Sequence, residues 1–343
     1  MNRNSASKIY PTMRKRKFGK TDLEVSEIGF GAWAIGGPVM AGKIPLGWGV
    51  ADDVISEKAL RKAVKQGINF IDTANFYGLG HSEELIGKIV GNDPRIVIAT
   101  KVGHRLDHNQ NILFDYSREH ILDACEHSLR RLKRDHIDYY QLHSARLIHL
   151  QTGECLEALE ILQKQGKIRY WGLSLNTYNP FPEAEFLLQR NLGNGLQLVF
   201  NIINQRAWEI ISEAGTRGMA VIARMPLQFG LLSGKFNAQS TFQEDDHRRF
   251  RLKSEVLKSA LENLEPIWEM AEKYQVTPAQ LSLSFVLSFP QVSTVIPGIR
   301  TPRQAKENST GLVQLEKGDI KILLDLYESR YRQLVDLMES QEG

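Results

Sequence analysis

The chain has 343 residues, of which 42% are hydrophobic and 24% charged, with 43 Lys and Arg against 40 Asp and Glu. This composition excludes an intrinsically disordered, a collagen-like and a coiled-coil protein. Roughly 100–200 residues per domain would suggest two domains, but an α/β barrel of about 250 residues is a single domain, so length alone does not decide.

The positive charge gathers at the start of the chain. Residues 1–21 hold seven Lys and Arg and no acid, whereas the remainder holds 36 bases against 40 acids. A mildly acidic body argues against a nucleic-acid surface. A transit peptide or a phosphate-binding arm would also be basic, but this acid-free stretch lacks an apolar face or a hydrophobic targeting segment. We therefore expect a disordered leader at 1–12 and one folded domain at 13–343.

The sequence contains neither a membrane span nor a metal motif. No apolar run approaches the about 20 residues that cross a bilayer. Cys125 and Cys155 are the only cysteines, which favours a reducing, cytoplasmic compartment. Neither cysteine lies in a metal-type spacing, and the nine histidines form no metalloenzyme pattern, so we expect no metal ion.

Short β-type runs alternate with amphipathic helical stretches along the chain. Eight strands are predicted at 25–30, 69–74, 96–102, 137–143, 168–175, 196–202, 219–225 and 292–297. Helices are predicted at 56–66, 82–90, 118–132, 154–165, 182–190, 207–217, within 255–274, and at 278–288 and 302–312. Strict alternation predicts a parallel sheet, and eight units over about 290 residues favour a closed (α/β)8 TIM barrel over an open, doubly wound sheet.

Several segments lie outside this alternation. Turn-forming residues within 17–23 predict an N-terminal β-hairpin placed to plug the bottom of the barrel, and a C-terminal helical extension is expected after Glu316. Three long connections, at 34–55, 103–117 and 228–253, would leave the C-terminal ends of strands. Active sites of barrel enzymes are built on this face.

Four polar residues lie at or just after predicted strand ends. Asp72, Lys101 and His143 end three consecutive strands, and Tyr77 follows Asp72 by five residues. Taken one at a time, each has an ordinary structural interpretation, such as a helix-capping Asp or a His packed under a loop. Together they suit proton transfer, because a tyrosine, whose ordinary pKa is about 10, becomes a usable acid at neutral pH only beside a cation that favours its phenolate. Lys101 can supply this cation, and Asp72 can hold it.

The segments around these residues resemble a known family. The runs FIDTANFYG at 70–78, TKVG at 100–103 and SLRRLKRDHIDYYQLH at 128–143 are similar, in this order, to motifs of the aldo-keto reductases. The similarity extends from about Met13 to Leu312. It implies an (α/β)8 barrel that binds a nicotinamide cofactor and passes a hydride to a substrate carbonyl. It also implies roles for the four residues, with Tyr77 as the general acid, Asp72 and Lys101 tuning it, and His143 orienting the carbonyl.

A glycine-rich strand end lies at 29–34, in the spacing Gly-x-Gly-x-x-Ala. A Rossmann fingerprint has this spacing, but it needs a helix at once, and the following Ile-Gly-Gly-Pro cannot begin one. The family resemblance instead places Gly31 and Ala32 under the nicotinamide and ribose, with Trp33 facing the substrate pocket.

The resemblance also implies ligands for the nicotinamide. Ser174 and Gln197 match the contacts of its carboxamide, although an amide satisfied inside the barrel is an alternative for Gln197. Asn176 is a less certain match, because it stands one residue later than in the usual family run. Arg224 occupies the place of the stacking aromatic ring, as in bacterial-type members with the Gly-x-Ser-x-Asn variant. A guanidinium can stack on a ring but would repel the oxidised, cationic nicotinamide, so we hypothesise that Arg224 favours the reduced cofactor.

The phosphates and the adenosine of the cofactor are expected at residues 226–235, at residues 296–300 and at the start of the helix at 302–312. The free N–H groups at the start of a helix suit an anion. The residues implied are Pro226, Leu227, Gly230, Leu231, Lys235, Pro297, Gly298 and Arg300 for the phosphates, and Gln304 and Asn308 for the adenosine. Gln304 stands where some members have an Arg for the 2′-phosphate, but Arg300 and Arg303 are near enough to replace it. NADP(H) is therefore favoured, with NAD(H) as the alternative.

The predicted function is NADPH-dependent reduction of an aldehyde, ketone or sugar. One alternative is a non-catalytic, nucleotide-sensing subunit like the channel β-subunits of this family, and another is sugar or polyol oxidation. The complete set of four residues favours an enzyme. Six residues at or after strand ends are candidates for the substrate pocket, namely Trp33, Trp48, Phe76, His104, Arg105 and Arg146. Of these, His104 and Arg105 would suit a polar or anionic substrate, whereas the oligomeric state cannot be inferred.

Overall fold

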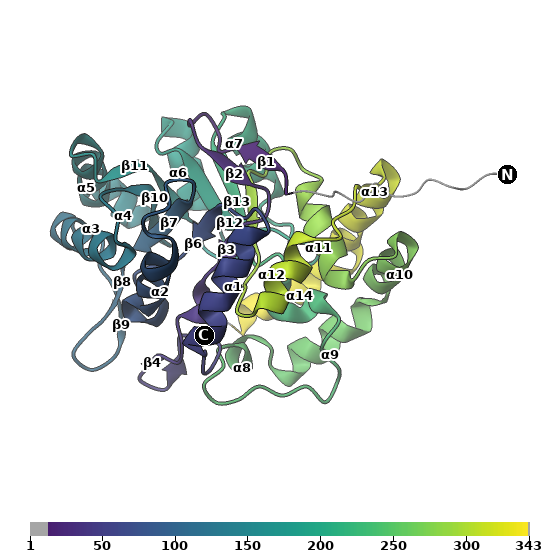
Figure 1. Ribbon diagram of the computed structural model, residues 1–343. Helices are drawn as coiled ribbons and strands as arrows, with labels where there is room; N and C mark the ends of the chain where they lie inside the picture. Colours follow the sequence, from purple (N-terminus) through teal and green to yellow (C-terminus); the bar gives the residue numbers. More distant parts are fainter. Residues whose placement is uncertain (1–12, 342–343) are drawn as a thin grey trace.

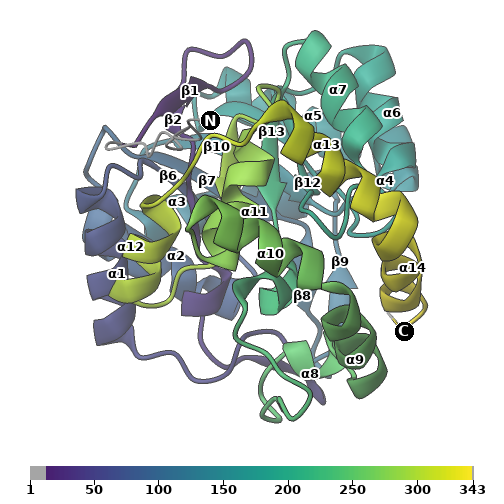
Figure 2. The same cartoon turned by 90° about the vertical axis from the view of Figure 1, so that its right-hand side faces the viewer.

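The computed structural model describes residues 13–341, so the expected leader lies outside the described residues (Figures 1 and 2). Eight parallel strands form one sheet in the order β14-β13-β12-β11-β10-β7-β6-β3. The strands are β3 (Phe30–Gly31), β6 (Phe70–Asp72), β7 (Val97–Val102), β10 (Ile137–His143), β11 (Ile168–Ser174), β12 (Gly195–Val199), β13 (Ala220–Arg224) and β14 (Thr294–Ile296).

The two edges of this sheet meet and close it. Residues next to and within β3 pair in parallel with residues next to and within β14, through bridges between Ile28 and Val295 and between Gly31 and Gly298. The backbone N–H of Gly31 donates to the carbonyl of Pro297 at 3.0 Å. The predicted (α/β)8 barrel is therefore confirmed.

Helices surround the strands (Figures 1 and 2). Those that follow strands of the barrel are α1 (Asp53–Lys65), α2 (His81–Val90), α3 (Arg118–Leu132), α5 (Glu154–Lys164), α6 (Phe181–Arg190), α7 (Trp208–Thr216), α11 (Pro278–Leu287) and α12 (Pro302–Ser309). Further helices are α4 (Leu147–Thr152), α8 (Arg248–Arg251), α9 (Ser254–Asn263), α10 (Glu265–Tyr274), α13 (Lys317–Leu326) and α14 (Arg332–Ser340), with a π-helical turn, η4 (Tyr327–Tyr331), between the last two. None of the helices in residues 13–341 is long and apolar enough to cross a membrane.

An N-terminal hairpin plugs the bottom of the barrel, as predicted. Its strands β1 (Lys15–Lys17) and β2 (Glu24–Ser26) pair antiparallel. Phe18, fully buried at the turn, packs against the rings of Phe70 and Tyr139, with centroids 5.6 and 4.9 Å away. Burial of three aromatic rings closes the barrel interior at this end.

The predicted first strand, 25–30, is divided between two sheets. Its beginning belongs to β2 of the hairpin and its end to β3 of the barrel. Two hydrogen bonds of Ser26 hold the turn between them: its hydroxyl donates to the carbonyl of Ile28 at 2.7 Å, and its N–H donates to the side chain of Asn69, before β6, at 2.6 Å.

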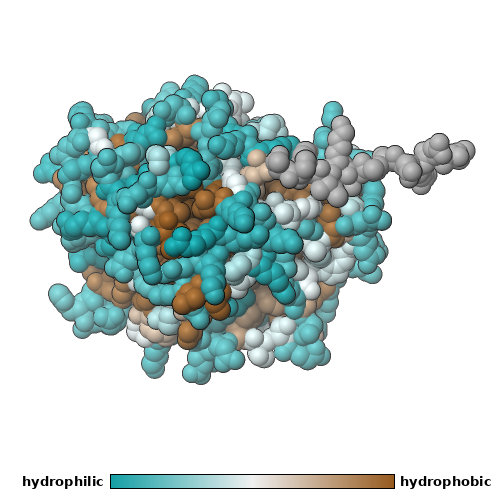
Figure 3. Space-filling model, in the orientation of Figure 1, coloured by the Kyte–Doolittle hydropathy of each residue, from teal (hydrophilic) through white to brown (hydrophobic). Residues whose placement is uncertain are grey.

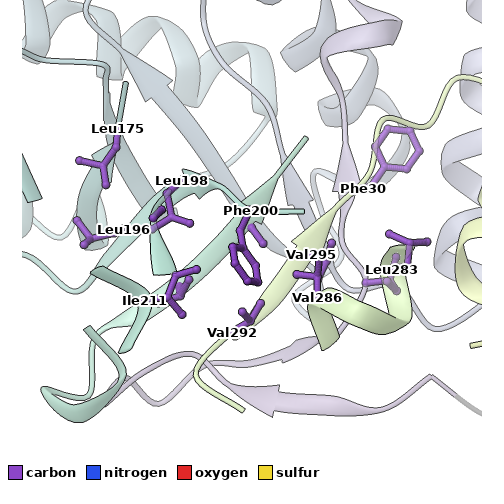
Figure 4. Close-up of a cluster of buried hydrophobic side chains, with 14 of the residues drawn as sticks. Phe30, Leu175, Leu196, Leu198, Phe200, Ile211, Leu283, Val286, Val292 and Val295 are labelled. Carbon is purple, nitrogen blue, oxygen red and sulfur yellow. The ribbon is translucent and has the colours of Figure 1, made fainter. Parts of the chain in front are cut away.

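The main hydrophobic core lies between the strands and the helices. In β12, Leu196 and Leu198 face this layer and pack near Ile211 of α7 and Phe200 (Figure 4). Alternate strand residues point to opposite faces, so Gln197 faces the barrel interior. The same alternation in β10 turns Tyr140 and Leu142 to the core and Tyr139, Gln141 and His143 inward. Polar side chains thereby reach the inside of the barrel.

The three long connections contain small elements of their own. The first holds the 3-10 turn η1 (Trp33–Ile35) and the hairpin β4 (Met40–Ala41) with β5 (Ile44–Pro45). The second is the hairpin β8 (His104–Leu106) with β9 (Ile112–Phe114), and the third holds the 3-10 segment η3 (Gln228–Ser233) and α8. They carry exposed apolar residues such as Met40, Val50, Phe114 and Phe250. The face shown in Figure 3 is otherwise largely hydrophilic, with hydrophobic residues in separate groups.

Candidate active site

The C-terminal ends of neighbouring strands bring the four predicted residues together. Asp72 ends β6, and Lys101 lies near the end of the adjacent strand β7. His143 ends β10, in which Gln141 pairs with Lys101. Tyr77 begins the 3-10 turn η2 (Tyr77–Gly80), which follows β6.

The ammonium group of Lys101 is at the centre of this site. Its Nζ donates hydrogen bonds to Asp72 Oδ1 at 2.5 Å, to the carbonyl of Thr73 at 2.9 Å and to Tyr77 Oη at 3.1 Å. Nζ also lies 4.7 Å from the centroid of the Tyr77 ring. The Lys101 side chain is 0% exposed. An unpaired charge in such a place would be costly, so these oxygens are what allows a lysine inside the barrel.

Opposing effects act on the pKa of Lys101. Burial lowers this pKa, but the charge of Asp72, the interaction with Tyr77 and the hydrogen bonds to both outweigh burial and raise it above its usual value. Lys101 is therefore a cation at neutral pH. This cation lies within hydrogen-bonding distance of the phenol oxygen.

A pair of glutamines holds the other oxygen of Asp72. Gln197 Nε2 donates to Asp72 Oδ2 at 2.7 Å, and Gln141 Nε2 donates to the same oxygen at 3.0 Å. The two amides also bond to each other at 3.1 Å. Gln141 was not among the predicted site residues, although the inward alternation of β10 toward His143 could have indicated it. Both oxygens of the carboxylate are thus fixed before any ligand binds.

His143 forms the next side of the site. Its ring lies edge-on to that of Tyr77, with centroids 5.9 Å apart. Burial, the neighbouring His104, and the charges of Lys101 and Arg224 lower the pKa of His143 well below its usual value. The imidazole is therefore neutral at pH 7, with one nitrogen as a donor and the other as an acceptor.

Aromatic side chains from two long connections surround Tyr77. Trp33 stacks on Tyr77, with centroids 6.1 Å apart and an angle of 25°, and its Nε1 donates to the carbonyl of Leu46 at 2.6 Å. Trp48 and His247 lie on the other sides of Trp33, at 5.8 and 5.3 Å. His247 was not predicted, because it stands in a long connection without any motif, and only the folded chain places it here.

The first long connection, which contains Trp48, and the third, which contains His247, are bonded to each other. The N–H of His247 donates to the carbonyl of Gly47 at 3.0 Å, and Trp48 forms a β-bridge with Asp246. Arg300, from the segment after β14, donates to the carbonyl of Trp48 at 2.9 Å. The connections therefore meet beside the joint where β3 and β14 close the barrel.

The predicted pocket residues fall into two groups. Four of them, Trp33, Trp48, Phe76 and His104, belong to the aromatic cluster around Tyr77 and His143. Arg105 instead forms an ion pair with Asp115 at 3.0 Å and is half-exposed. Arg146 is exposed at the start of α4.

Two glycines, Gly31 and Gly298, pair with each other at the joint between β3 and β14. A Cβ at Gly31 would lie 2.8 Å from the carbonyl oxygen of Pro297, so a side chain here would force the strands apart. A Cβ at Gly298 would meet only the ring of Trp48, at 3.7 Å. The glycine-rich strand end continues into η1, a three-residue turn, where a Rossmann motif would have a long helix. The joint therefore carries no side chain at these two positions.

The predicted nicotinamide ligands lie at the ends of neighbouring strands. Ser174 in β11 pairs with Gln197 in β12, and their side-chain oxygens are 3.4 Å apart. Arg224 ends β13, and its guanidinium donates to the carbonyl of Leu175 at 3.0 Å. Asn176 accepts hydrogen bonds from the N–H groups of residues 178 and 179, so its side chain shapes the turn after β11.

The predicted phosphate and adenosine residues lie in or next to η3, in the segment after β14 and in α12. In η3 and its flanks, Pro226 and Leu231 are buried, Leu227 and Gly230 are partly buried, and Lys235 is exposed. Pro297 and Gly298 follow β14, and Thr301 caps α12. Gln304 Oε1 accepts from the N–H groups of Arg300 and Thr301 at 2.8 and 3.1 Å, while Asn308 is buried.

Comparison with known proteins agrees with this arrangement. A model of the aldo/keto reductase family matches residues 27–328. The chain belongs to the aldo/keto reductase family. Members of this family are oxidoreductases that use a nicotinamide cofactor, and they act on small carbonyl compounds.

Similar aldo/keto reductases are found in several bacteria. The chain is 31% identical to the uncharacterized oxidoreductase YqkF of Bacillus subtilis, over 91% of this chain and 95% of that protein. It is 27% identical to the NADH-specific methylglyoxal reductase of Escherichia coli, over 93% of this chain and 100% of that protein. Among solved structures, the glycerol dehydrogenase AKR11B4 of Gluconobacter oxydans superposes with a TM-score of 0.74 and 27% identity, over 92% and 95% of the two chains. The holo form of AKR11C1 from Bacillus halodurans gives 0.73 and 27%, over 92% and 96%.

We predict that Asp72→Leu lowers the free energy of unfolding by about 3–5 kcal/mol, because Lys101 would be left buried without a counter-charge. The double variant Asp72→Leu/Lys101→Met should recover most of this loss, since neither charge remains. Urea unfolding followed by circular dichroism measures both changes. The control is Asp325→Leu, which breaks an exposed ion pair with Lys321 and should cost less than about 1 kcal/mol. An Asp72→Leu variant no less stable than this control would contradict the prediction.

Proposed function

We propose that this aldo/keto reductase reduces the carbonyl group of an aldehyde, ketone or sugar to an alcohol with NADPH, and that Tyr77 is the general acid. The proposal rests on the position of Lys101 Nζ, which is 2.5 Å from Asp72 Oδ1 and 3.1 Å from Tyr77 Oη. A cation held at this distance stabilises the negative charge that remains on the phenol oxygen when its proton leaves.

Each side chain of the site has its own role in the proton transfer. The reduced nicotinamide, when bound, supplies a hydride to the carbonyl carbon. Tyr77 gives its proton to the carbonyl oxygen, and Lys101 stabilises the phenolate. Asp72 keeps Lys101 in place, while the neutral His143 donates a hydrogen bond that orients the same carbonyl. General acid catalysis of this kind contributes roughly 10²–10⁴ in rate.

The two glycines at the joint of β3 and β14 and the start of α12 support a dinucleotide site beside these residues. Without a side chain at Gly298, a ring can approach the backbone closely, and the positive end of the α12 helix dipole suits phosphate. We infer that Gly31, Ala32, Trp33, Ser174, Asn176, Gln197 and Arg224 contact the nicotinamide end. We infer that the remainder is held by Pro226, Leu227, Gly230, Leu231, Lys235, Pro297, Gly298, Arg300, Gln304 and Asn308.

Both cysteines support the cytoplasmic location that we also propose. Cys125 and Cys155 are buried free thiols, and burial raises the pKa of the first to about 12 and of the second to about 11. Thiols kept in this state suit a reducing compartment.

A second candidate function is the reverse reaction, the oxidation of an alcohol. A relative named L-galactose dehydrogenase in Arabidopsis thaliana is 28% identical, and the glycerol dehydrogenase is structurally similar. The same proton donor can accept a proton from an alcohol. Assays with NADPH and carbonyl compounds, and with NADP⁺ and sugars or polyols, distinguish the two directions.

We predict that Tyr77→Phe lowers kcat by about 10²–10⁴ and leaves the Kd for NADPH unchanged, since only the acid is removed. The measurement is NADPH absorbance with a panel of small aldehydes, ketones and aldoses. Tyr170→Phe is the control, because Tyr170 bonds to Asp22 at the hairpin end of the barrel and should keep full activity.

Two results would count against Tyr77 as the acid of a working enzyme. One is a Tyr77→Phe variant with undiminished kcat. The other is an unmodified protein that binds NADPH tightly without turnover, which would indicate nucleotide sensing. Relatives from Oryza sativa and Arabidopsis thaliana, 26% and 27% identical, are named as probable potassium channel β-subunits.

Arg300 and Arg303 support the preference for NADP(H), because Arg300 precedes the cap residue Thr301 and Arg303 lies in the first turn of α12. Arg303 is exposed and pairs only along its own helix, with Glu307 at 3.1 Å. We predict that Arg300→Ala and Arg303→Ala each weaken NADPH binding about tenfold or more, with little change for NADH. Titration of tryptophan fluorescence gives both Kd values, and Lys306→Ala on the same helix is the control. Equal losses of affinity for NADPH and NADH would show that neither arginine binds the 2′-phosphate.

Arg224 generates a prediction about the redox state of the cofactor. Its guanidinium is fixed by Leu175 and by Thr177 Oγ1 at 3.2 Å, beside the proposed nicotinamide site. A fixed cation repels the oxidised ring and tolerates the neutral reduced ring, so Arg224→Tyr should raise the affinity for NADP⁺ relative to NADPH. Isothermal titration of both forms measures this ratio, and an unchanged ratio would refute the hypothesis.

A further inference from the structure

The β8–β9 hairpin covers one face of the His143 ring. His104, the first residue of β8, stacks on His143 with centroids 4.1 Å apart and an angle of only 11°. On its other sides, His104 meets Phe114 and Phe76 edge-on, at 4.9 and 5.5 Å. A second imidazole thus lies parallel to the one that contacts the substrate in the proposed reaction.

This stack is built into the hairpin. Phe114 is the direct cross-strand partner of His104, so the two rings lie on the same face of the hairpin. Tyr116, just after β9, donates from its hydroxyl to the carbonyl of His143 at 2.5 Å. Its ring occupies the space beside Gly103, whose φ of +121° and lack of a Cβ permit this contact. The hairpin is therefore attached to His143 both by ring contact and through the backbone.

The surroundings of Nδ1 indicate which nitrogen of the His143 ring carries the proton. Nδ1 of His143 is buried, and none of the described residues offers it a hydrogen bond. A buried N–H without an acceptor is less tolerable than a bare lone pair, so the proton of the neutral ring stays on Nε2. The ring then has a single hydrogen-bond donor, at Nε2.

We propose that His104 is a positioning residue, which covers one face of the His143 ring, keeps that ring buried and so holds it as a neutral, Nε2-protonated imidazole. That Nε2–H serves a substrate carbonyl rests on the proposed function, whereas the charge and tautomer of His143 do not. His104 itself contacts His143 and the two phenylalanines and has no part in the proton transfer.

The charged and titratable groups around His143 agree with this role. Lys101 on β7 and Arg224 on β13 are cations, His104 on β8 is neutral, and Tyr77 and Tyr116 face the ring and its backbone. Burial lowers the pKa of His104 to about 4, against the hydrogen bond with the His143 carbonyl that raises it. No carboxylate among the described residues pairs with His143. Its burial, to which His104 contributes, and the nearby cations therefore both favour the neutral ring.

The charge and tautomer of His143 are measured directly by ¹⁵N NMR of the histidine rings in the full chain without cofactor. His143→Gln identifies the signal. In the unmodified protein we expect an Nε2–H ring that stays neutral between about pH 5 and 8. In His104→Ala, water reaches the ring, and its midpoint should rise toward 6.5, the ordinary value. His104→Phe keeps a ring over His143 and should keep it neutral, and His108→Ala, at the exposed tip of the same hairpin, should change nothing.

Steady-state kinetics distinguish this positioning role of His104 from a purely structural one. His104→Ala should lower kcat for carbonyl reduction about tenfold or more, with the Kd for NADPH unchanged, whereas His104→Phe should restore kcat. Should His104→Ala not fold, His104→Asn uncovers part of the same ring. An Nδ1–H tautomer, or a His143 midpoint that is the same with and without His104, overturns the proposal. If instead no variant reduces any carbonyl, the proposed function fails while the NMR result still decides the role of His104.

Discussion

The site depends on one buried ion pair, between the Lys101 ammonium and the Asp72 carboxylate. Removing either charge from water is costly, and the pair is tolerated only because every hydrogen-bonding position around it is filled. Asp72 uses one oxygen for Lys101 and the other for Gln141 and Gln197. This arrangement leaves the third bond of Lys101 Nζ directed at the Tyr77 hydroxyl. The same interactions that stabilise the charge in the barrel therefore place a cation beside the Tyr77 hydroxyl, as its proposed role as the acid requires.

The barrel places these groups through strand register and through closure. Parallel pairing of β6, β7 and β10 brings their last residues to one end. Closure between β3 and β14 needs Gly31, because any side chain there would meet the Pro297 carbonyl. That steric requirement also keeps position 31, next to Ala32 and Trp33, free of a side chain. Connections that start far apart in the sequence then close the site from above, with Trp48, Asp246 and His247 in contact.

Much of this organisation follows from local patterns in the sequence. Eight apolar runs, each followed by an amphipathic helix, leave few alternatives to a barrel, and polar residues at strand ends identify Asp72, Lys101 and His143. Gln141 was missed because a glutamine in an apolar strand carries no motif, although its inward alternation with His143 was visible. His247 and Phe114 could not be found at all, since nothing near them in the chain indicates their contacts. The first strand was placed as one element because an apolar run does not show where Ser26 turns the chain.

The sequence by itself determined the fold class and the family and singled out the four residues proposed for proton transfer, because hydrophobic periodicity and family motifs are local properties of the chain. The tertiary structure alone decided how these residues are held. It showed that Gln141 and Gln197 share one oxygen of Asp72, that two long connections meet over Trp33, and that His104 lies flat on His143. These are contacts between segments up to about 200 residues apart, such as Trp33 and His247. Their geometry arises from packing in three dimensions, which no local pattern encodes.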